Sequence, residues 1–350
     1  MASFSINNVK VSGIAAAVPK NSISNWDYDL LTDSEKKLLI KTTGIESKRV
    51  VNDGVTTSDL CYEAAKKLIL ELNWQKEEIQ VVIFLSQSRD YYLPATSIIL
   101  QDRLGLSKSC MAFDIGLGCS GFVYGLSVIG SIMSATGLSK GLLMVGDISS
   151  LTCSKEDKST YPLFGDAGTA TAIEWTKGSE MNFSLNSDGS GFETIMIPAG
   201  GVRNVVNKKS FDVKEIDKGI KRNDLNLALK GLDVFSFSVK EVPTSIYSFF
   251  EKFDVSGAEF DYFLMHQANK LMNETIRKKV KIEAEKTPYS LKNYGSTSSA
   301  SIPLTIVTEL QSAVKTKSLN LLLAGFGVGL SWGISSLPLN KIVCPDLIEI

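Results

Sequence analysis

The feature that most constrains the fold is an order of strands and helices that occurs twice along the chain. In the first half, the apolar run at 80–88 (QVVIFLSQS) predicts a buried strand, and a helical pattern follows near 95–104. In the second half, the run at 260–268 (FDYFLMHQA) is followed by a helical pattern near 269–281. Short apolar runs alternating with helices are typical of α/β proteins with covered sheets. A recurrence at this long period indicates a duplicated domain rather than a solenoid.

The repeat continues through a turn of small residues and a long apolar helix, which begin at Gly116 in the first half and at Tyr294 in the second. Each helix leads into a strand, at 141–147 and 320–326, and each repeat ends in a further strand-like segment, at 166–175 and 327–337. We therefore expect two α/β halves, residues 1–175 and 176–350. The polar segment 203–227 interrupts the second half, and we expect it to be a surface excursion.

The composition excludes several classes of function. The 350 residues include 37 Lys and Arg against 38 Asp and Glu, so no surplus charge indicates a nucleic-acid or anionic-membrane partner. The 5 cysteines have no close paired spacing and the chain has 1 histidine, which argues against a disulfide framework and a zinc site.

Two features bear on location. The first residues, MASFSINNVKVSGIAAAVPKN, lack a basic head, an apolar core and a cleavage site, so we expect a strand and a cytoplasmic protein. The stretches 115–139 and 318–340 are uncharged and long enough to span a bilayer, but both are rich in glycine. We interpret them as a buried helix and two core strands, without membrane insertion.

The repeat also places three polar residues close together. Cys119 lies at the mouth of the first long helix, Ser296 lies near the mouth of the corresponding helix, and His266 directly follows a strand. Ligands of open α/β sheets bind at the carboxyl ends of strands and at the helix starts that follow. Pseudo-twofold packing of the halves would therefore bring these residues to one central cleft.

The surroundings of Cys119 favour a reactive thiol. Free N–H groups and the positive end of the helix dipole favour the thiolate, and thiols in such positions reach pKa values of about 3.5 to 7.5. The glycines at 116, 118 and 121 allow a sharp turn and close approach of a substrate. A structural cysteine and a core histidine are the alternatives, but a cysteine and a histidine joined by the fold are typical of thiolate catalysis.

At these residues the chain resembles the thiolase-fold condensing enzymes, most closely the β-ketoacyl-acyl-carrier-protein synthase III group. The similarity follows family order over nearly the full length, in the blocks VSGIAAAVP, TTGIESKR, GCSGFVYGL, FGDAGTATAIE, SDGSGFETIMIPAGG, HQAN, YGSTSSASIPL and GFGVGLSWG. The resemblance implies a duplicated thiolase-like fold of five layers, α-β-α-β-α, with two mixed sheets.

The resemblance also implies roles for individual residues. Cys119 would take an acyl group from acyl-coenzyme A or an acyl carrier protein, and His266 would hydrogen-bond the thioester carbonyl of the second substrate. The backbone N–H groups of Cys119 and Val328 would form the oxyanion hole. Leu93 matches a residue lent to the partner's acyl pocket, which implies a homodimer, although Leu93 could also be a core leucine. No metal or organic cofactor is implied.

One block departs from the family pattern. The family places asparagine beside the histidine in GNTS, but this chain reads Gly295-Ser296-Thr297-Ser298. A serine hydroxyl donates one hydrogen bond and reaches less far than an amide. Ser296 could compensate directly or through water, Asn293 could replace the amide if the loop is rearranged, or the enzyme does not decarboxylate. Ser296 could also be only a helix cap.

A second departure concerns the acyl carrier. Family members that bind coenzyme A stack its adenine between tryptophan and arginine, where this chain has Leu38 and Thr42. Leu271 replaces an arginine after HQAN, and Leu232 stands where asparagine is common. Acyl groups could therefore arrive on an acyl carrier protein, whose acidic surface needs basic partners. The substrate-binding candidates outside the catalytic set are Leu93, Lys158, Asn269 and Lys270, and Arg277 is a further basic candidate at the mouth.

The leading hypothesis is decarboxylative Claisen condensation of the acyl group on Cys119 with malonyl-acyl-carrier protein, giving a 3-oxoacyl-acyl-carrier protein. The first alternative is acyl transfer to an oxygen or nitrogen nucleophile without decarboxylation, which Ser296 favours. The second is a non-catalytic subunit of an active partner, although such subunits tend to lose the cysteine.

Overall fold

Two long strands connect the halves of the molecule. The structure, a computed structural model that describes residues 2–350, contains β1 (Ala2–Val18) and β7 (Asp166–Ser187), which pair antiparallel from Ala2 opposite Leu185 to Ala17 opposite Gly168. The other edge of β7 pairs with β6 (Lys140–Ile148) in its first part and with β14 (Ser331–Asn340) in its last part. Each half therefore attaches its own strands to a different end of one ribbon.

Hydrogen bonding makes the strands of both halves one nine-stranded mixed sheet, in the order β12-β13-β14-β7-β6-β4-β5 with β1 and β15 at the side. The remaining strands of this sheet are β4 (Ile79–Leu85), β5 (Met111–Ile115), β12 (Tyr262–Met265), β13 (Ser318–Gly327) and β15 (Ile348–Glu349). The predicted mixed α/β fold is confirmed, and the two expected sheets are continuous through β1 and β7. The expected boundary at 175 lies inside β7.

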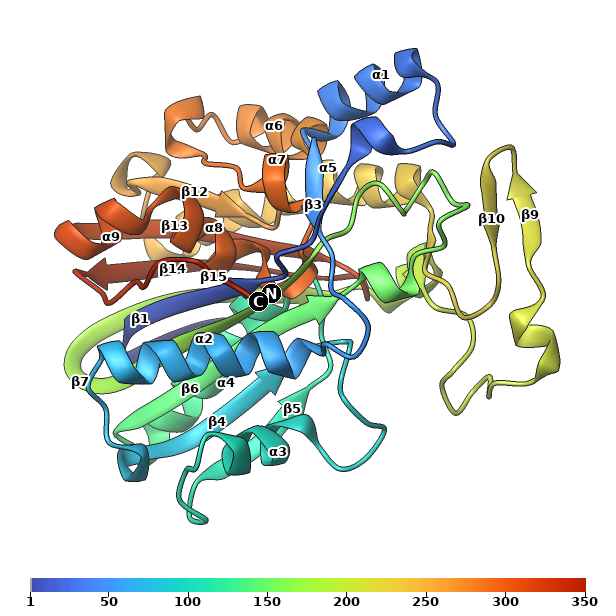
Figure 1. The fold of residues 1–350 in the computed structure, drawn as a ribbon. Helices are drawn as coiled ribbons and strands as arrows, with labels where there is room; N and C mark the ends of the chain where they lie inside the picture. Colours follow the sequence, from blue (N-terminus) through green and yellow to red (C-terminus); the bar gives the residue numbers. More distant parts are fainter. Residues whose placement is uncertain (1) are drawn as a thin grey trace.

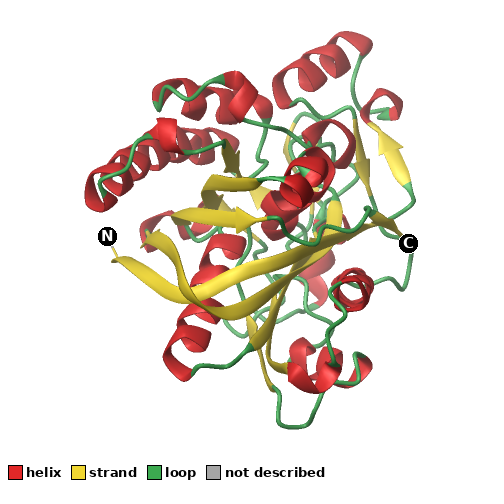
Figure 2. Ribbon diagram, turned by 90° about the vertical axis from the view of Figure 1, so that its left-hand side faces the viewer, coloured by secondary structure: helices red, strands yellow, loops and turns green. Residues whose placement is uncertain are grey.

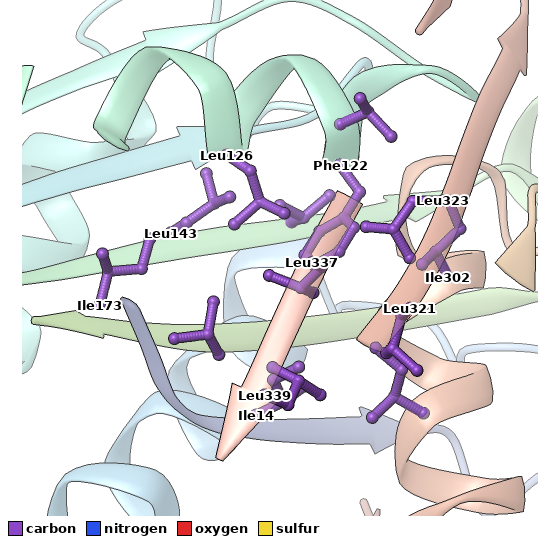
Figure 3. Packing of buried hydrophobic residues seen from close by; sticks show 14 of the residues in the cluster. Ile14, Phe122, Leu126, Leu143, Ile173, Ile302, Leu321, Leu323, Leu337 and Leu339 are labelled. Atoms are coloured by element: carbon purple, nitrogen blue, oxygen red, sulfur yellow. The ribbon is translucent and has the colours of Figure 1, made fainter. Parts of the chain in front are cut away.

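Helices cover both faces of these strands, and Figure 2 shows the strands running through the middle of the molecule. Two apolar helices lie between the halves, and their buried side chains share one core with the strands of both halves (Figure 3). They are α4 (Gly121–Thr136) and α8 (Ser301–Glu309). This arrangement gives the layer order helix, sheet, helix, sheet, helix.

The outer layers have their own cores. In the first half, α2 (Thr57–Glu71) and α3 (Thr96–Arg103) pack on the outer face, and in the second half α5 (Gly231–Phe253) and α6 (Lys270–Lys279) do so. The shorter helices are α1 (Asp33–Thr43), α7 (Leu291–Tyr294) and α9 (Gln311–Thr316). Within residues 2–350, no helix is long and apolar enough to cross a bilayer.

The predicted excursion projects from the body as a two-stranded hairpin (Figure 1). It consists of β9 (Lys214–Asp217) and β10 (Ile220–Arg222), and its base is held by an Arg222–Asp157 ion pair of 2.9 Å. Two further short strand pairings complete the fold outside the main sheet. They join β2 (Ser22–Ser24) to β3 (Ser47–Arg49) and β8 (Ile195–Met196) to β11 (Ala228–Leu229).

Candidate active site

One cavity of about 250 Å³ is lined by residues from both halves of the chain. Cys119, His266 and Ser296, the three polar residues that the repeat predicted to converge, all line it. Apolar side chains form most of the remaining wall, among them Leu229, Val234, Met272 and Phe326. An apolar passage with a few convergent polar groups is typical of a small-molecule or cofactor-arm site.

Cys119 lies in the turn between β5 and α4, two residues before the helix begins. The turn approaches the end of β13 so closely that a methyl group on Gly327 would lie 2.6 Å from the Cβ of Cys119 and 2.9 Å from its sulfur. Real side chains do not tolerate such distances, so only glycine fits at 327. This contact fixes the sulfur beside the turn that contains Val328.

The thiol is not activated in the way that the sequence suggested. Burial raises the pKa of Cys119 to about 11, and the nearby Asp147 carboxylate also raises this pKa, although hydrogen bonds from the Val328 and Cys119 N–H groups and from Ser298 lower it. The prediction of a lowered pKa is therefore wrong, because loss of water around the sulfur outweighs the donors at the helix start. The raised pKa leaves the Cys119 thiol neutral at neutral pH.

The two backbone N–H groups predicted to form an oxyanion hole converge on the sulfur of Cys119. Those of Cys119 and Val328 both act on the sulfur. Val328 itself lines the cavity. N–H groups that converge beside a nucleophile can also reach the oxygen of the carbonyl that it attacks. The oxyanion-hole assignment stays a prediction, and this convergence favours it.

His266 follows β12 and is held rigidly from several sides. Its backbone N–H donates to Ala324 across 2.8 Å, and Asn273 donates its side-chain N–H to the His266 carbonyl across 3.0 Å. The ring Nδ1 lies 2.9 Å from the Ser301 hydroxyl, and the ring packs edge-on against Phe326. Burial lowers the pKa of His266 to about 4, so the imidazole is neutral at neutral pH.

Ser296 lies in the turn between α7 and α8, and its backbone pairs with a segment of the first half. Its N–H donates to Leu163 across 2.8 Å, while Gly165 donates to the Ser296 carbonyl across 3.1 Å. The residue is buried and lines the cavity. Asn293 is exposed and is not part of the cavity wall, so it does not replace the missing amide in this arrangement of the loop.

The sequence analysis missed a buried carboxylate beside the site. Asp147, at the end of β6, accepts hydrogen bonds from the Gln87 N–H at 2.7 Å, the Ser86 hydroxyl at 3.1 Å and the Ser299 hydroxyl at 2.6 Å. Burial raises its pKa, and these hydrogen bonds lower it. Because Ser86 and Gln87 belong to one half and Ser299 to the other, Asp147 ties the halves together at the cavity. The sequence contained one signal for this residue, an aspartate at the end of the apolar run 141–147.

The substrate-binding candidates divide into two groups. Asn269 lines the cavity, but its side-chain oxygen accepts from the Met272 N–H at 2.8 Å and so caps α6. Leu93, Lys158 and Lys270 do not line it, and Leu93 is 77% exposed. Arg277 is paired with Glu274 at 2.7 Å and also donates to the Ile282 carbonyl, so it is not a free cation for a partner.

A partly buried thiol, a neutral imidazole and converging N–H groups at the junction of two similar α/β halves are the site of a thiolase-fold condensing enzyme. The family model for 3-oxoacyl-[acyl-carrier-protein (ACP)] synthase III matches residues 113–189, and the model for the C-terminal part of the same family matches residues 250–338. The chain is 31% identical to a β-ketoacyl-[acyl-carrier-protein] synthase III of Clostridioides difficile, over 93% of this chain and 96% of that protein. The chain belongs to the 3-oxoacyl-acyl-carrier-protein synthase III family.

Solved structures agree with this assignment. A 3-oxoacyl-(acyl-carrier protein) synthase from Burkholderia xenovorans LB400 superposes with a TM-score of 0.94, at 34% identity and 99% coverage of both chains. The priming β-ketosynthase of the R1128 polyketide pathway superposes with a TM-score of 0.82 at 21% identity, which shows the shared fold alone. The expected thiolase-like fold is confirmed.

Proposed function

We propose that this protein condenses an acyl group carried on Cys119 with malonyl-acyl-carrier protein, releasing carbon dioxide and forming a 3-oxoacyl-acyl-carrier protein. The observation that carries the proposal is the convergence of Cys119, His266 and the Val328 turn on one apolar cavity. An apolar passage suits the phosphopantetheine arm and acyl chain of a thioester substrate. Both steps use only protein groups and substrate thioesters, so no metal or organic cofactor takes part.

An acyl carrier protein is the proposed acyl donor, in preference to coenzyme A. The adenine-stacking pair is replaced by Leu38, which is 65% exposed, and the partly buried Thr42. Two further positions where the family has polar residues carry exposed leucines, Leu271 at 51% and Leu232 at 85%. The three leucines offer neither the hydrogen bonds nor the charge that a nucleotide needs, whereas a protein helix can cover apolar side chains. Lys158 and Lys270 remain basic candidates for an acidic carrier surface.

A homodimer in the cytoplasm is also proposed. Leu93 lies in an exposed segment with Tyr91 and Tyr92, which are 62% and 61% exposed. Contiguous exposed apolar side chains of this size are typical of protein interfaces. Sedimentation of the wild type and of Leu93→Asp tests this directly, because an unchanged sedimentation coefficient would contradict a role for Leu93 at the interface.

The proposed reaction is tested in two stages with purified enzyme. Intact-mass spectrometry after incubation with acyl-coenzyme A or acyl-carrier protein should show one acyl adduct, absent in Cys119→Ala and formed faster from the carrier protein. The acylated enzyme should then release labelled carbon dioxide from carboxyl-labelled malonyl-acyl-carrier protein. Absence of an adduct with every donor would support a non-catalytic subunit and contradict the proposal.

Acyl transfer to an oxygen or nitrogen nucleophile is the second candidate, and Ser296 favours it. The hydroxyl stands where the family has an amide donor, and the exposed Asn293 does not supply one. An adduct on Cys119 that passes to an alcohol or amine without release of carbon dioxide would establish this second reaction and refute condensation.

A further inference from the structure

The wall of the cavity is not uniformly apolar, because two neighbouring strands of the first half end in polar residues that line it. Gln87 follows β4 and Ser149 directly follows β6. These strands pair in parallel, with Leu85 opposite Val145, so their carboxyl ends lie side by side. An acyl chain attached to Cys119 therefore enters a cavity that offers hydrogen-bonding groups as well as hydrocarbon.

The side chain of Gln87 lies against the turn that presents the nucleophile. A methyl group on Gly118 would lie 2.9 Å from the amide carbon of Gln87 and 2.7 Å from the side chain of Val328. The backbone N–H of Gln87 donates to the buried Asp147 carboxylate across 2.7 Å, which fixes the base of the side chain. Because Gly118 precedes Cys119, we expect the Gln87 amide to lie beside the first carbons of an acyl group on the sulfur.

The polar side chains of Gln87 and Ser149 make no hydrogen bond to other groups within residues 2–350. The neighbouring Ser88 hydroxyl, by contrast, accepts from the Ile148 N–H across 2.9 Å. Gln87 is exposed and Ser149 is half-buried, so water reaches both side chains until an acyl group fills the cavity. A plain hydrocarbon chain would remove that water without replacing its hydrogen bonds, which is unfavourable.

We propose that the acyl group taken by Cys119 carries a hydroxyl on carbon 2 or 3, and that Gln87 and Ser149 recognise this hydroxyl. The proposal rests on the proposed function, because it names the acyl group of the same first step. A hydroxyl both donates and accepts hydrogen bonds, so it can pair with either end of the Gln87 amide and with a serine hydroxyl. Gln87 is thus assigned as a specificity-determining residue.

An uncharged substituent suits this cavity better than a charged one. The titratable side chains in its wall are Cys119, Asp147 and His266, and no lysine or arginine of the described chain lines it. The thiol and the imidazole are neutral at neutral pH, and the Asp147 oxygens already accept hydrogen bonds from protein groups. A carboxylate or an ammonium group on the acyl chain would therefore lose its water without gaining an opposite charge.

Competition between two acyl groups on the same carrier protein tests the proposal. Wild-type enzyme is mixed with equal amounts of butyryl-carrier and 2- or 3-hydroxybutyryl-carrier, in both enantiomers, and intact-mass spectrometry follows the two adducts on Cys119. The carrier and its phosphopantetheine arm are identical, so the ratio of rates reports the acyl group alone. We expect one hydroxylated group to react about 10- to 100-fold faster than butyryl. Equal or slower reaction of every hydroxylated isomer would overturn the proposal.

Three variants separate recognition of the hydroxyl from a general effect on the cavity. Gln87→Met keeps the length of the side chain without its amide and should bring the ratio of rates close to one. Ser149→Ala should lower the ratio by a smaller factor. Ile197→Ala is the matched control, since it changes an apolar part of the cavity wall and should leave the ratio unchanged. If Gln87→Met slows both acyl groups equally, Gln87 serves the fold or the carrier arm, and its assigned role is refuted.

Failure of the proposed function would look different, because binding can be measured without acylation. Calorimetric titration of Cys119→Ala with butyryl-pantetheine and with the hydroxybutyryl-pantetheines compares their affinities when no adduct can form. Tighter binding of a hydroxylated compound together with no adduct on the wild type would support the assignment of Gln87 and remove the acylation reaction. Active wild type with no preference in either assay would remove the assignment of Gln87 alone.

Discussion

Lys48 carries an ammonium group inside the protein, and its titration should be visible in the stability of the whole chain. The side chain is 0% exposed. Its Nζ donates to the Tyr161 carbonyl and lies 3.7 Å from the centre of the Tyr161 ring. Burial lowers the pKa of Lys48 from 10.5 to about 8, although Cys153 and Asp166 act in the opposite direction.

The sign and size of the effect follow from proton binding. Between pH 8 and 10.5 the unfolded chain keeps this proton while the folded protein has lost it, so the free energy of unfolding rises with pH. The two pKa values differ by about 2.5, and each pH unit contributes about 1.4 kcal/mol per proton. The contribution of Lys48 to the free energy of unfolding should therefore become about 3 kcal/mol more favourable between pH 7 and 10.5.

The measurement compares wild type with Lys48→Met by urea unfolding at one protein concentration, followed by fluorescence and circular dichroism. The titrations of other groups cancel in the difference between the two proteins. That difference should grow by about 3 kcal/mol in favour of the wild type as pH rises from 7 to 10.5. The exposed Lys37→Met is the matched control and should give a constant difference. A constant difference for Lys48→Met as well would refute the assignment of a buried, destabilised ammonium group.

Three further outcomes are expected at the site. Ser296→Asn should raise the rate of carbon dioxide release about 10²–10³-fold, because the amide restores one hydrogen-bond donor to the developing enolate. A slower rate in stopped-flow assays would contradict this role. Gly327→Ala should slow Cys119 acylation at least about 100-fold in mass-spectrometric time courses, because the added methyl group displaces the sulfur. If this variant is acylated at the wild-type rate, the contact is not rigid. The rate at which iodoacetamide alkylates Cys119, with Cys119→Ala as the blank, should increase steadily from pH 6 to 10, because burial raises the pKa of Cys119 to about 11. A rate that reaches a plateau below pH 8 would instead indicate a thiolate.

The position of the site was predictable from the sequence, but its electrostatics were not. The order of strands and helices placed Cys119, His266 and Ser296 at corresponding ends of two similar halves, and all three line one cavity. The pKa of Cys119 depends on how completely distant elements enclose the sulfur, and local sequence contains no measure of that enclosure. The helix start was recognised correctly, yet desolvation outweighed it.

Hydrogen bonds between elements distant in sequence were equally hidden. Asp147 joins Ser86 to Ser299, and Ser301 joins His266 to Ser298, through hydrogen bonds that require the final packing. The length of β1 and β7 was also missed, because irregular pairing near Asn7 and Val9 lets β1 continue where the apolar alternation breaks. Such features follow from tertiary context rather than from local propensity.

The ribbon of β1 and β7 has a consequence for how the polypeptide matures. During synthesis β1 finds its full partner only when residue 187 has been made, and its last residues also pair with Ile348 and Glu349. Contacts of such long sequence separation close slowly, and an unpaired apolar strand is exposed to aggregation until they form. A fragment ending at residue 175 would contain one complete sequence repeat but would cut β7 in its middle, so a gene truncated there should yield insoluble protein rather than an independent module.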